Sequence, residues 1–144
     1  MTLPVAIGSD HAGFAYKTAL ISWLEGKGYK IIDHGVGENK SVDYPDYAHA
    51  VATTVESGKV AFGILLCGSA NGVCMTANKH AGIRAGLAYM PDVAKLIRQH
   101  NDANIICLPA RFVALELAME MVSIFIETEF EGGRHQTRVS KISC

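Results

Sequence analysis

Residues 61–72 read Ala-Phe-Gly-Ile-Leu-Leu-Cys-Gly-Ser-Ala-Asn-Gly, a short apolar run that leads directly into a loop of small and polar residues. A continuous apolar run closed by turn residues is typical of a buried strand in a parallel sheet. Open α/β sheets bind ligands at the carboxyl ends of such strands, and Cys67 is the last residue of this one. The stretch therefore predicts a parallel sheet with Cys67 at its functional edge.

The loop after Cys67 can bind an anion. It consists of Gly68, Ser69, Ala70, Asn71 and Gly72. Backbone N–H groups of such a loop can turn toward one point just before a helix begins, and that point attracts negative charge. The same field favours a Cys67 thiolate, which is a nucleophile or a proton acceptor. The alternative is that Cys67 is a small buried hydrophobic residue, as free cysteines commonly are.

Length and composition indicate one compact domain. The chain has 144 residues, of which 49% are hydrophobic and 19% charged, a balance typical of globular proteins. Thirteen basic and fourteen acidic side chains give a net charge of −1, so no basic excess is available for nucleic acid or an anionic membrane. Because the N-terminus lacks a leader pattern and no apolar run reaches spanning length, we expect a cytoplasmic protein.

Cysteine and histidine spacing offers no metal site. The four cysteines are dispersed, at Cys67, Cys74, Cys107 and Cys144, and form no Cys-x-x-Cys pair. The six histidines include no His-Glu-x-x-His motif. We therefore expect free thiols, no metal and no cofactor.

Apolar segments alternate with helical patterns along the whole chain. Strands are predicted near 4–9, 29–33, 61–67, 83–88 and 104–108. Helices are predicted near 13–26, 45–57, 71–79, 91–100 and 112–127. Five βα units predict a single-domain α/β fold, Rossmann-like or flavodoxin-like, in which helices cover both faces of a five-stranded parallel sheet as a three-layer sandwich.

The first predicted strand ends at Asp10 and His11, at the same sheet edge as Cys67. Asp10 suits an N-cap of the following helix as well as a binding role, and His11 could instead face solvent. Residues 8–13 lack the Gly-x-Gly-x-x-Gly spacing, and 68–72 is not a Walker loop, so nucleotide cofactors are disfavoured.

Two further segments carry candidate residues. His100 continues the apolar spacing of its helix, which places it on the buried face at the helix end, and the simple interpretation is a histidine bonded to a carbonyl. In the tail, Arg134 and Arg138 share a face if a helical turn forms, and two guanidinium groups would bind a phosphate. The alternative for the arginines is solvent-exposed pairing with Glu129 or Glu131.

Six short motifs occur together in the chain. They are Ser9-Asp10-His11-Ala12-Gly13, Asp43-Tyr44-Pro45, Cys67-Gly68-Ser69, Ala77-Asn78-Lys79, the segment Arg98-Gln99-His100-Asn101-Asp102 with Asn104, and Glu131-Gly132-Gly133-Arg134-His135. Each motif is weak alone, but their joint order resembles the ribose-5-phosphate isomerase B family, which includes the galactose-6-phosphate isomerase subunits. The resemblance covers essentially the whole chain.

This resemblance implies cofactor-free interconversion of ribose 5-phosphate and ribulose 5-phosphate, a step of the pentose phosphate pathway. It also implies a homodimer, or a tetramer, with active sites at the subunit interface. The whole chain, 1–144, would be one sugar-phosphate isomerase domain, and residues 128–144 would form a tail that carries phosphate-binding arginines.

The resemblance also implies residue roles. Cys67 would transfer the proton through a cis-enediolate, with the 68–72 amides (Gly68, Ala70, Asn71 and Gly72 among them) as an anion hole. Asp10 and His100 would assist ring opening, and Ser69 would bond the reacting oxygens. The phosphate ligands would be His11, Arg134 and Arg138, with His135 and Arg111 as weaker candidates, and the sugar contacts would be Tyr44 and Asn101.

The chain departs from the family pattern at two positions. Some members carry a catalytic Glu where this chain has Val73, so the base must be Cys67. Ala70 stands where the family usually has Gly, and a positive φ there would strain the loop.

Two other functions remain open from the sequence. One is an isomerase of a hexose 6-phosphate, such as allose or galactose 6-phosphate, because one extra carbon is a modest change of pocket. The other is a non-catalytic phosphosugar-binding module that uses the 68–72 loop only to bind an anion.

Overall fold

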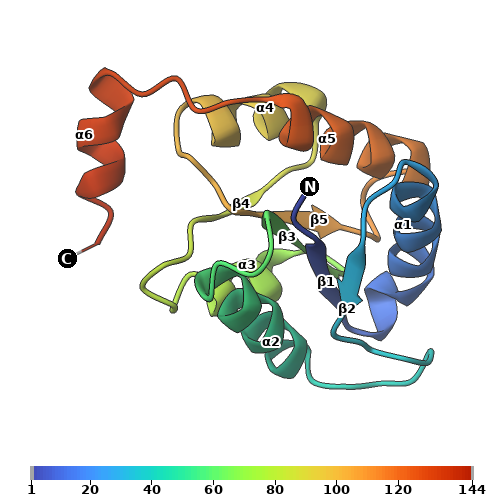
Figure 1. The fold of residues 1–144 in the computed structure, drawn as a ribbon. Helices are drawn as coiled ribbons and strands as arrows, with labels where there is room; N and C mark the ends of the chain where they lie inside the picture. The colour runs from blue at the N-terminus through green and yellow to red at the C-terminus, as the bar shows by residue number, and fades with distance from the viewer. Residues whose placement is uncertain (1, 144) are drawn as a thin grey trace.

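The computed structural model describes residues 2–143 and centres on one five-stranded parallel sheet (Figure 1). The strands are β1 (Val5–Ser9), β2 (Ile31–Asp33), β3 (Phe62–Cys67), β4 (Ala85–Leu87) and β5 (Ile105–Pro109). Their order in the sheet is β2-β1-β3-β5-β4, and every neighbouring pair is parallel. The predicted α/β class and all five predicted strands are confirmed, while β4 and β5 exchange places relative to the flavodoxin order.

Helices cover both faces of the sheet. They are the 3₁₀ turn η1 (His11–Gly13), α1 (Phe14–Gly26), α2 (Tyr44–Glu56), α3 (Asn71–Ala77), α4 (Pro91–Gln99), α5 (Leu115–Glu127) and α6 (Arg134–Ser140). One core cluster joins α1, α4 and α5 to the sheet, and a second joins α2 and α3 to its other face. Alternate residues of β1 pack into the two clusters: Val5 and Ile7 into the first, and Ala6 into the second. This arrangement is the predicted three-layer sandwich.

Element boundaries differ from the predictions at several ends. The second and fourth strands are shorter than predicted, and α3 stops at Ala77. The last predicted helix begins at Leu115 rather than near 112, because the chain first turns after β5, where the Phe112 and Val113 amides both donate to the Pro109 carbonyl. His100 does not lie on the buried face of α4. It follows the helix as a C-cap, and its side chain is 39% exposed.

The tail helix α6 has no apolar face. None of its residues is buried, and Figure 1 shows it standing apart from the layered body. Its sequence, Arg-His-Gln-Thr-Arg-Val-Ser, has no apolar periodicity, which is why the sequence predicted a turn only conditionally. None of the described helices combines the length and apolar character that crossing a membrane requires.

Candidate active site

The carboxyl ends of β1 and β3 lie side by side. In their parallel register Ser9 is opposite Leu66, so Asp10 and Cys67 follow the two strands at the same edge. The Asp10 amide donates to the Leu66 carbonyl at 3.4 Å and connects the two strand ends. We name Asp10, His11, residues 67–72 and Arg111 the sheet-edge group.

Asp10 is buried and caps the turn that follows it. One oxygen of its carboxylate accepts hydrogen bonds from the Ala12 amide at 3.0 Å and the Gly13 amide at 3.3 Å. The predicted N-cap is therefore confirmed, and the two bonds hold the carboxylate at the end of β1.

Two polar atoms beside Asp10 are buried without a partner in the described part of the chain. They are Ser9 Oγ and His11 Nδ1. A buried polar atom without a hydrogen bond costs about 1–3 kcal/mol, and such atoms concentrate where function requires them. His11 is thus held against the fold rather than turned wholly toward solvent.

Cys67 is 5% exposed and is fixed by the turn after β5. The Cys67 carbonyl accepts from the Ala110 amide at 3.0 Å, and the Gly68 carbonyl accepts from the Arg111 amide at 3.1 Å. These backbone bonds extend the β3–β5 pairing past the strand ends, so the thiol sits on a rigid part of the sheet.

Side chains from two other elements lie against the 68–72 loop. A Cβ at Gly68 would lie 3.2 Å from Arg111 Cδ and Nη1, which places that guanidinium directly over the loop. A Cβ at Gly72 would lie 2.4 Å from the Tyr44 ring, so a side chain at position 72 would displace that ring from the loop. Arg111 and Tyr44, both predicted from the resemblance, therefore converge on the loop next to Cys67.

The loop backbone is strained at Ala70. Ala70 has φ of 65°, in the left-handed region, as the sequence comparison with the family pattern anticipated. That conformation costs a non-glycine residue about 1–2 kcal/mol. Next to it, the Ser69 hydroxyl oxygen accepts from the Asn71 amide at 3.3 Å, which bends the loop toward α3.

A second set of candidate residues lies at the end of α4 and in the tail. Glu131 Oε1 lies 3.5 Å from His100 Nε2 and 3.4 Å from His135 Nε2. The two imidazoles stack with centroids 4.1 Å apart and planes 12° apart. We name His100, Glu131, Arg134, His135 and Arg138 the tail group.

The environment of His135 disfavours its protonation. Loss of solvent around the imidazole lowers the pKa of His135, and the positive charges of His100, Arg134 and Arg138 lower it further. The Glu131 carboxylate acts in the opposite direction. The neutral form of His135 is therefore favoured relative to a free histidine.

The two predicted phosphate-binding arginines are on α6. Arg138 Nη1 donates to the Arg134 carbonyl at 3.4 Å, so the two residues share one side of the helix as the sequence analysis anticipated. Gly132 and Gly133, which precede α6, both have positive φ, at 68° and 56°. Both arginines are exposed, and their guanidinium groups are available to an anion.

The tail group also contains a possible metal-ligand set. Donor atoms of His100, Glu131 and His135 lie within 4.8 Å of one another. The rings are stacked nearly parallel, so their in-plane Nε2 lone pairs run side by side and do not converge on one ion. In these rotamers one oxygen of the Glu131 carboxylate contacts both the His100 and the His135 imidazole.

The structure does not bring the sheet-edge and tail groups together within one chain. Within the described residues 2–143, no hydrogen bond or ion pair connects the two groups.

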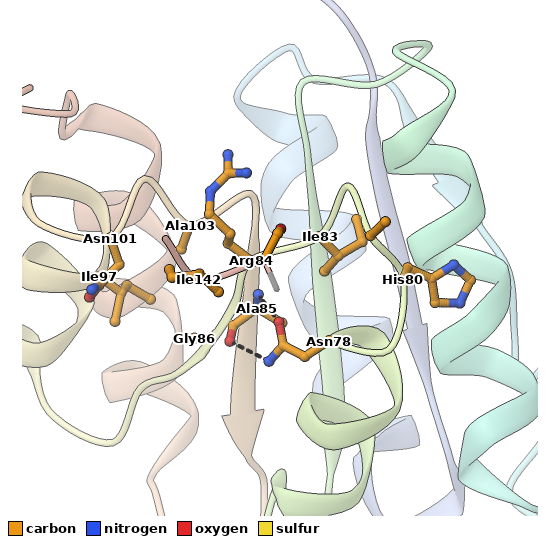
Figure 2. Close-up of a pocket in the computed structure, with 12 residues that line it drawn as sticks. Asn78, His80, Ile83, Arg84, Ala85, Gly86, Ile97, Asn101, Ala103 and Ile142 are labelled. Atoms are coloured by element: carbon orange, nitrogen blue, oxygen red, sulfur yellow. Dashed lines mark hydrogen bonds between the residues drawn. The ribbon is translucent and has the colours of Figure 1, made fainter. Parts of the chain in front are cut away.

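A cavity of about 530 Å³ lies along the β4 edge, and of the predicted site residues only Asn101 lines it (Figure 2). In the same view the Asn78 amide pairs with the Ala85 backbone, at 2.9 and 2.8 Å, and closes the edge of β4.

Sequence reasoning did not assign a role to Glu131, to Asp102 or to Arg84. Glu131 was considered as a partner of the tail arginines, and it lies instead against the two histidines. Its spacing of four from His135 is not a helical signal, because Glu131 precedes α6 and the positive φ of Gly132 and Gly133 separates it from that helix. Of the two arginine partners of Asp102, Arg98 lies four residues earlier, whereas Arg84 comes from a distant segment that no local spacing indicates.

Residues 5–142 match the family described as Ribose/Galactose Isomerase. The chain belongs to this family. Among members of the Ribose/Galactose Isomerase family, ribose-5-phosphate isomerase B of Escherichia coli is 44% identical over 97% of this chain and 94% of its own length.

Solved structures of this family have the same fold. Ribose 5-phosphate isomerase of Thermotoga maritima has a TM-score of 0.97 and 47% identity, over 99% of both chains. Ribose-5-phosphate isomerase B of Mycoplasma genitalium, solved with bound ribulose-5-phosphate, has a TM-score of 0.94 and 40% identity over 99% of this chain and 95% of its own.

Proposed function

We propose that this protein is an aldose–ketose isomerase that interconverts ribose 5-phosphate and ribulose 5-phosphate in the pentose phosphate pathway. The observation that carries the proposal is the Cys67 thiol, buried at the end of β3 and adjoined by the 68–72 loop, Arg111 and Tyr44. The relatives described as ribose-5-phosphate isomerase B, one of them solved with ribulose-5-phosphate, support this substrate pair over a hexose phosphate.

Cys67 is the base of the proposed reaction. Its thiolate takes the proton from C2 of the open-chain aldose, which leaves a cis-enediolate. The thiol then returns a proton to C1 of the enediolate while a hydroxyl proton passes from O2 to O1, and the ketose results. The position after Gly72, which is Glu in some relatives' pattern, is the buried Val73, so it offers no carboxylate. A sugar α-proton is weakly acidic, and the base therefore needs partners that stabilise the anion.

The 68–72 loop supplies that stabilisation in the proposal. The loop presents backbone amides, and Ser69 adds a hydroxyl that bonds the reacting oxygens. Because these dipoles are fixed before the substrate arrives, they stabilise the enediolate without reorganising during the reaction.

The remaining roles follow the polarity of each group. Asp10 and His100 assist ring opening by moving the proton between the ring oxygen and the anomeric hydroxyl. Tyr44 and Asn101 contact the sugar. The phosphate is bound by His11, Arg134 and Arg138, with His135 and Arg111 as secondary ligands. These contacts with the phosphate, remote from the reacting carbons, hold C1 and C2 of the sugar against Cys67.

We further propose a homodimer, or a tetramer built from it, in which each site combines the sheet-edge group of one chain with the tail group of its partner. Two observations support this. Helix α6 has no buried residue, although a seven-residue helix is too short to be stable unpacked. Exposed apolar side chains, Met75, Tyr89, Met90 and Ile142, also remain on the isolated chain.

The chain is proposed to act as a single domain, 1–144, in the cytoplasm, with residues 128–144 as its phosphate-binding tail. Cys67, Cys74 and Cys107 are free thiols, which suits a reducing compartment. Cys144, also expected to be free, lies outside the described residues.

The test is an isomerase assay with purified protein in excess chelator, on ribose 5-phosphate and on allose 6-phosphate. We expect turnover of ribose 5-phosphate without added metal. Turnover of only the hexose phosphate would keep the mechanism and change the substrate. Binding of either sugar phosphate without turnover would replace the isomerase with a binding module.

A further inference from the structure

Asp102 occupies an unusual backbone conformation directly after two proposed site residues. His100 and Asn101 lie in the turn that ends α4, and Asp102 follows them with φ of 49°, in the left-handed region. Apart from Ala70, it is the only described residue other than glycine with a positive φ. Such conformations persist only where surrounding contacts enforce them, and they cluster at functional sites.

Two arginines from different elements hold Asp102. Arg84, next to β4, donates through Nε to the Asp102 carbonyl at 2.8 Å and through Nη2 to its carboxylate at 3.3 Å. Arg98, in the last turn of α4, donates through Nη1 to the other carboxylate oxygen at 3.2 Å and to the Ala103 carbonyl at 2.6 Å. The carboxylate is therefore bound on both oxygens, and the backbone on either side of it is bound as well.

The same contacts connect this turn to the start of the tail. Arg98 Nε donates to the Thr128 carbonyl at 3.1 Å, and the Glu131 amide donates to the Gln99 carbonyl at 3.1 Å. The turn that carries His100 is thus fixed relative to the segment that carries Glu131 and His135. The contacts of His100 with Glu131 and His135 depend on this connection.

We propose that Asp102, held by Arg84 and Arg98, is a positioning residue that fixes His100 and Asn101 for the reaction. The inference rests on the proposed function, in which His100 assists ring opening and Asn101 contacts the sugar. Asp102 itself has no part in the chemistry, because both of its carboxylate oxygens are already bound to arginine. Its effect reaches the substrate through the placement of the two residues before it.

Two substitutions separate the carboxylate from the backbone conformation. Asp102→Gly keeps a residue that accepts positive φ and removes the carboxylate that the two arginines bind. For ribose 5-phosphate we expect kcat to fall about tenfold, while KM changes by no more than about threefold. Asp102→Asn keeps one acceptor oxygen, and we expect a partial rescue, with kcat lowered about threefold. The matched control is Asp92→Asn. Asp92 is an exposed aspartate in α4, the helix that precedes Asp102, and its substitution should leave kcat unchanged.

A double-mutant cycle tests whether the effect passes through His100. In a His100→Asn background, Asp102→Gly should lower kcat by no more than about threefold further, because His100, one of the two residues that Asp102 positions, is already gone. A second tenfold loss in that background would overturn the proposal, as would a kcat for Asp102→Gly within twofold of the parent protein.

A readout independent of turnover separates this proposal from the proposed function. The stacked His100 and His135 rings should shift one another's imidazole proton resonances upfield in NMR spectra, and Asp102→Gly should remove that shift while the melting temperature changes little. An unchanged shift would overturn the positioning role. If the parent protein does not isomerise ribose 5-phosphate, the proposed function fails, and the NMR result still decides whether Asp102 positions His100.

Discussion

The sheet-edge group and the tail group are held in opposite ways. Cys67 and Asp10 are buried at the ends of two paired strands, and backbone bonds fix the residues on either side of them. The tail group is anchored at one end, through the turn of Asp102 and the Gln99 carbonyl, and its arginines lie on a helix with no buried face. The comparison teaches that, in the proposed reaction, one chain holds its proton-transfer base on a rigid strand end and its phosphate-binding arginines on a helix with no buried residue.

This difference matches what each part of the proposed reaction needs. Moving a proton between adjacent carbons tolerates little error in position, so the base belongs on a rigid strand end. A phosphate presents three equivalent oxygens and can be held by flexible charged side chains. A tail that becomes ordered only against a partner chain can therefore still serve the phosphate.

The largest expected effect comes from the sheet-edge group. Cys67→Ser should fold normally and lose roughly 10³-fold or more in kcat, because a hydroxyl is a poor base at neutral pH. Steady-state kinetics with circular dichroism as a folding check measures this. Cys74→Ser is the matched control, because Cys74 is also a free thiol on the α3 side of the sheet but outside both groups. A Cys67→Ser protein with near-normal turnover would remove the thiol from the mechanism.

Alkylation of the Cys67 thiol tests its role without a substitution. The neighbouring Cys74 thiol and burial raise the pKa of Cys107 well above its usual range, so Cys107 should not react with iodoacetamide. Modification at Cys67 should abolish turnover, and ribose 5-phosphate should protect against it. A protein without turnover that still binds ribose 5-phosphate in part after alkylation of Cys67 would instead be a binding module.

The tail group should give a smaller effect of a different kind. Arg138→Ala should raise KM about tenfold with a smaller change in kcat, because a phosphate contact is similar in the ground and transition states. Lys141→Ala, which removes a neighbouring exposed charge in the same tail, should change neither constant appreciably. An unchanged KM for Arg138→Ala would move the phosphate to another part of the molecule.

The smallest effect concerns the pH dependence of stability. Because the folded state lowers the pKa of His135, the unfolded chain binds protons more readily, and His135 destabilises the fold as pH falls below about 6.5. Above that pH both states hold the neutral imidazole, and the contribution vanishes. His135→Gln should therefore lose less stability than the parent protein between pH 7 and pH 5, measured by urea unfolding. A steeper loss of stability in the variant would show that the fold of the parent protein raises the pKa of His135 instead.

The sequence predicted the fold and the sheet-edge group more closely than the tail. Alternating apolar runs and helical spacing were sufficient for the three layers, and the loop after Cys67 is local in sequence. The strand order was not predicted, although the five-residue, fully buried β5 lies inside the sheet and the three-residue, half-buried β4 lies at its edge. The placement of His100 was wrong, since its spacing matched the apolar stripe of α4 but the helix ends one residue earlier.

The contacts of Asp102 explain why the rest of the site could not be predicted. Arg84 and Asp102 meet although 18 positions separate them, and Arg98 reaches Thr128 across 30 positions. Such pairs depend on how β4, α4 and the tail pack, which no short pattern encodes. Even Ala70 required the structure, because only its φ of 65° shows that the loop is strained there.

The most direct measurement mixes two inactive variants. Cys67→Ser and His100→Ala proteins are each assayed alone, then mixed at equal concentration under conditions that exchange subunits, with hybrid formation verified by native mass spectrometry. If each site combines the sheet-edge group of one chain with the tail group of the other, hybrid dimers contain one intact site, and activity should recover to about a quarter of the parent level. Hybrids that form but stay inactive would contradict the account, because both groups of a site would then come from one chain.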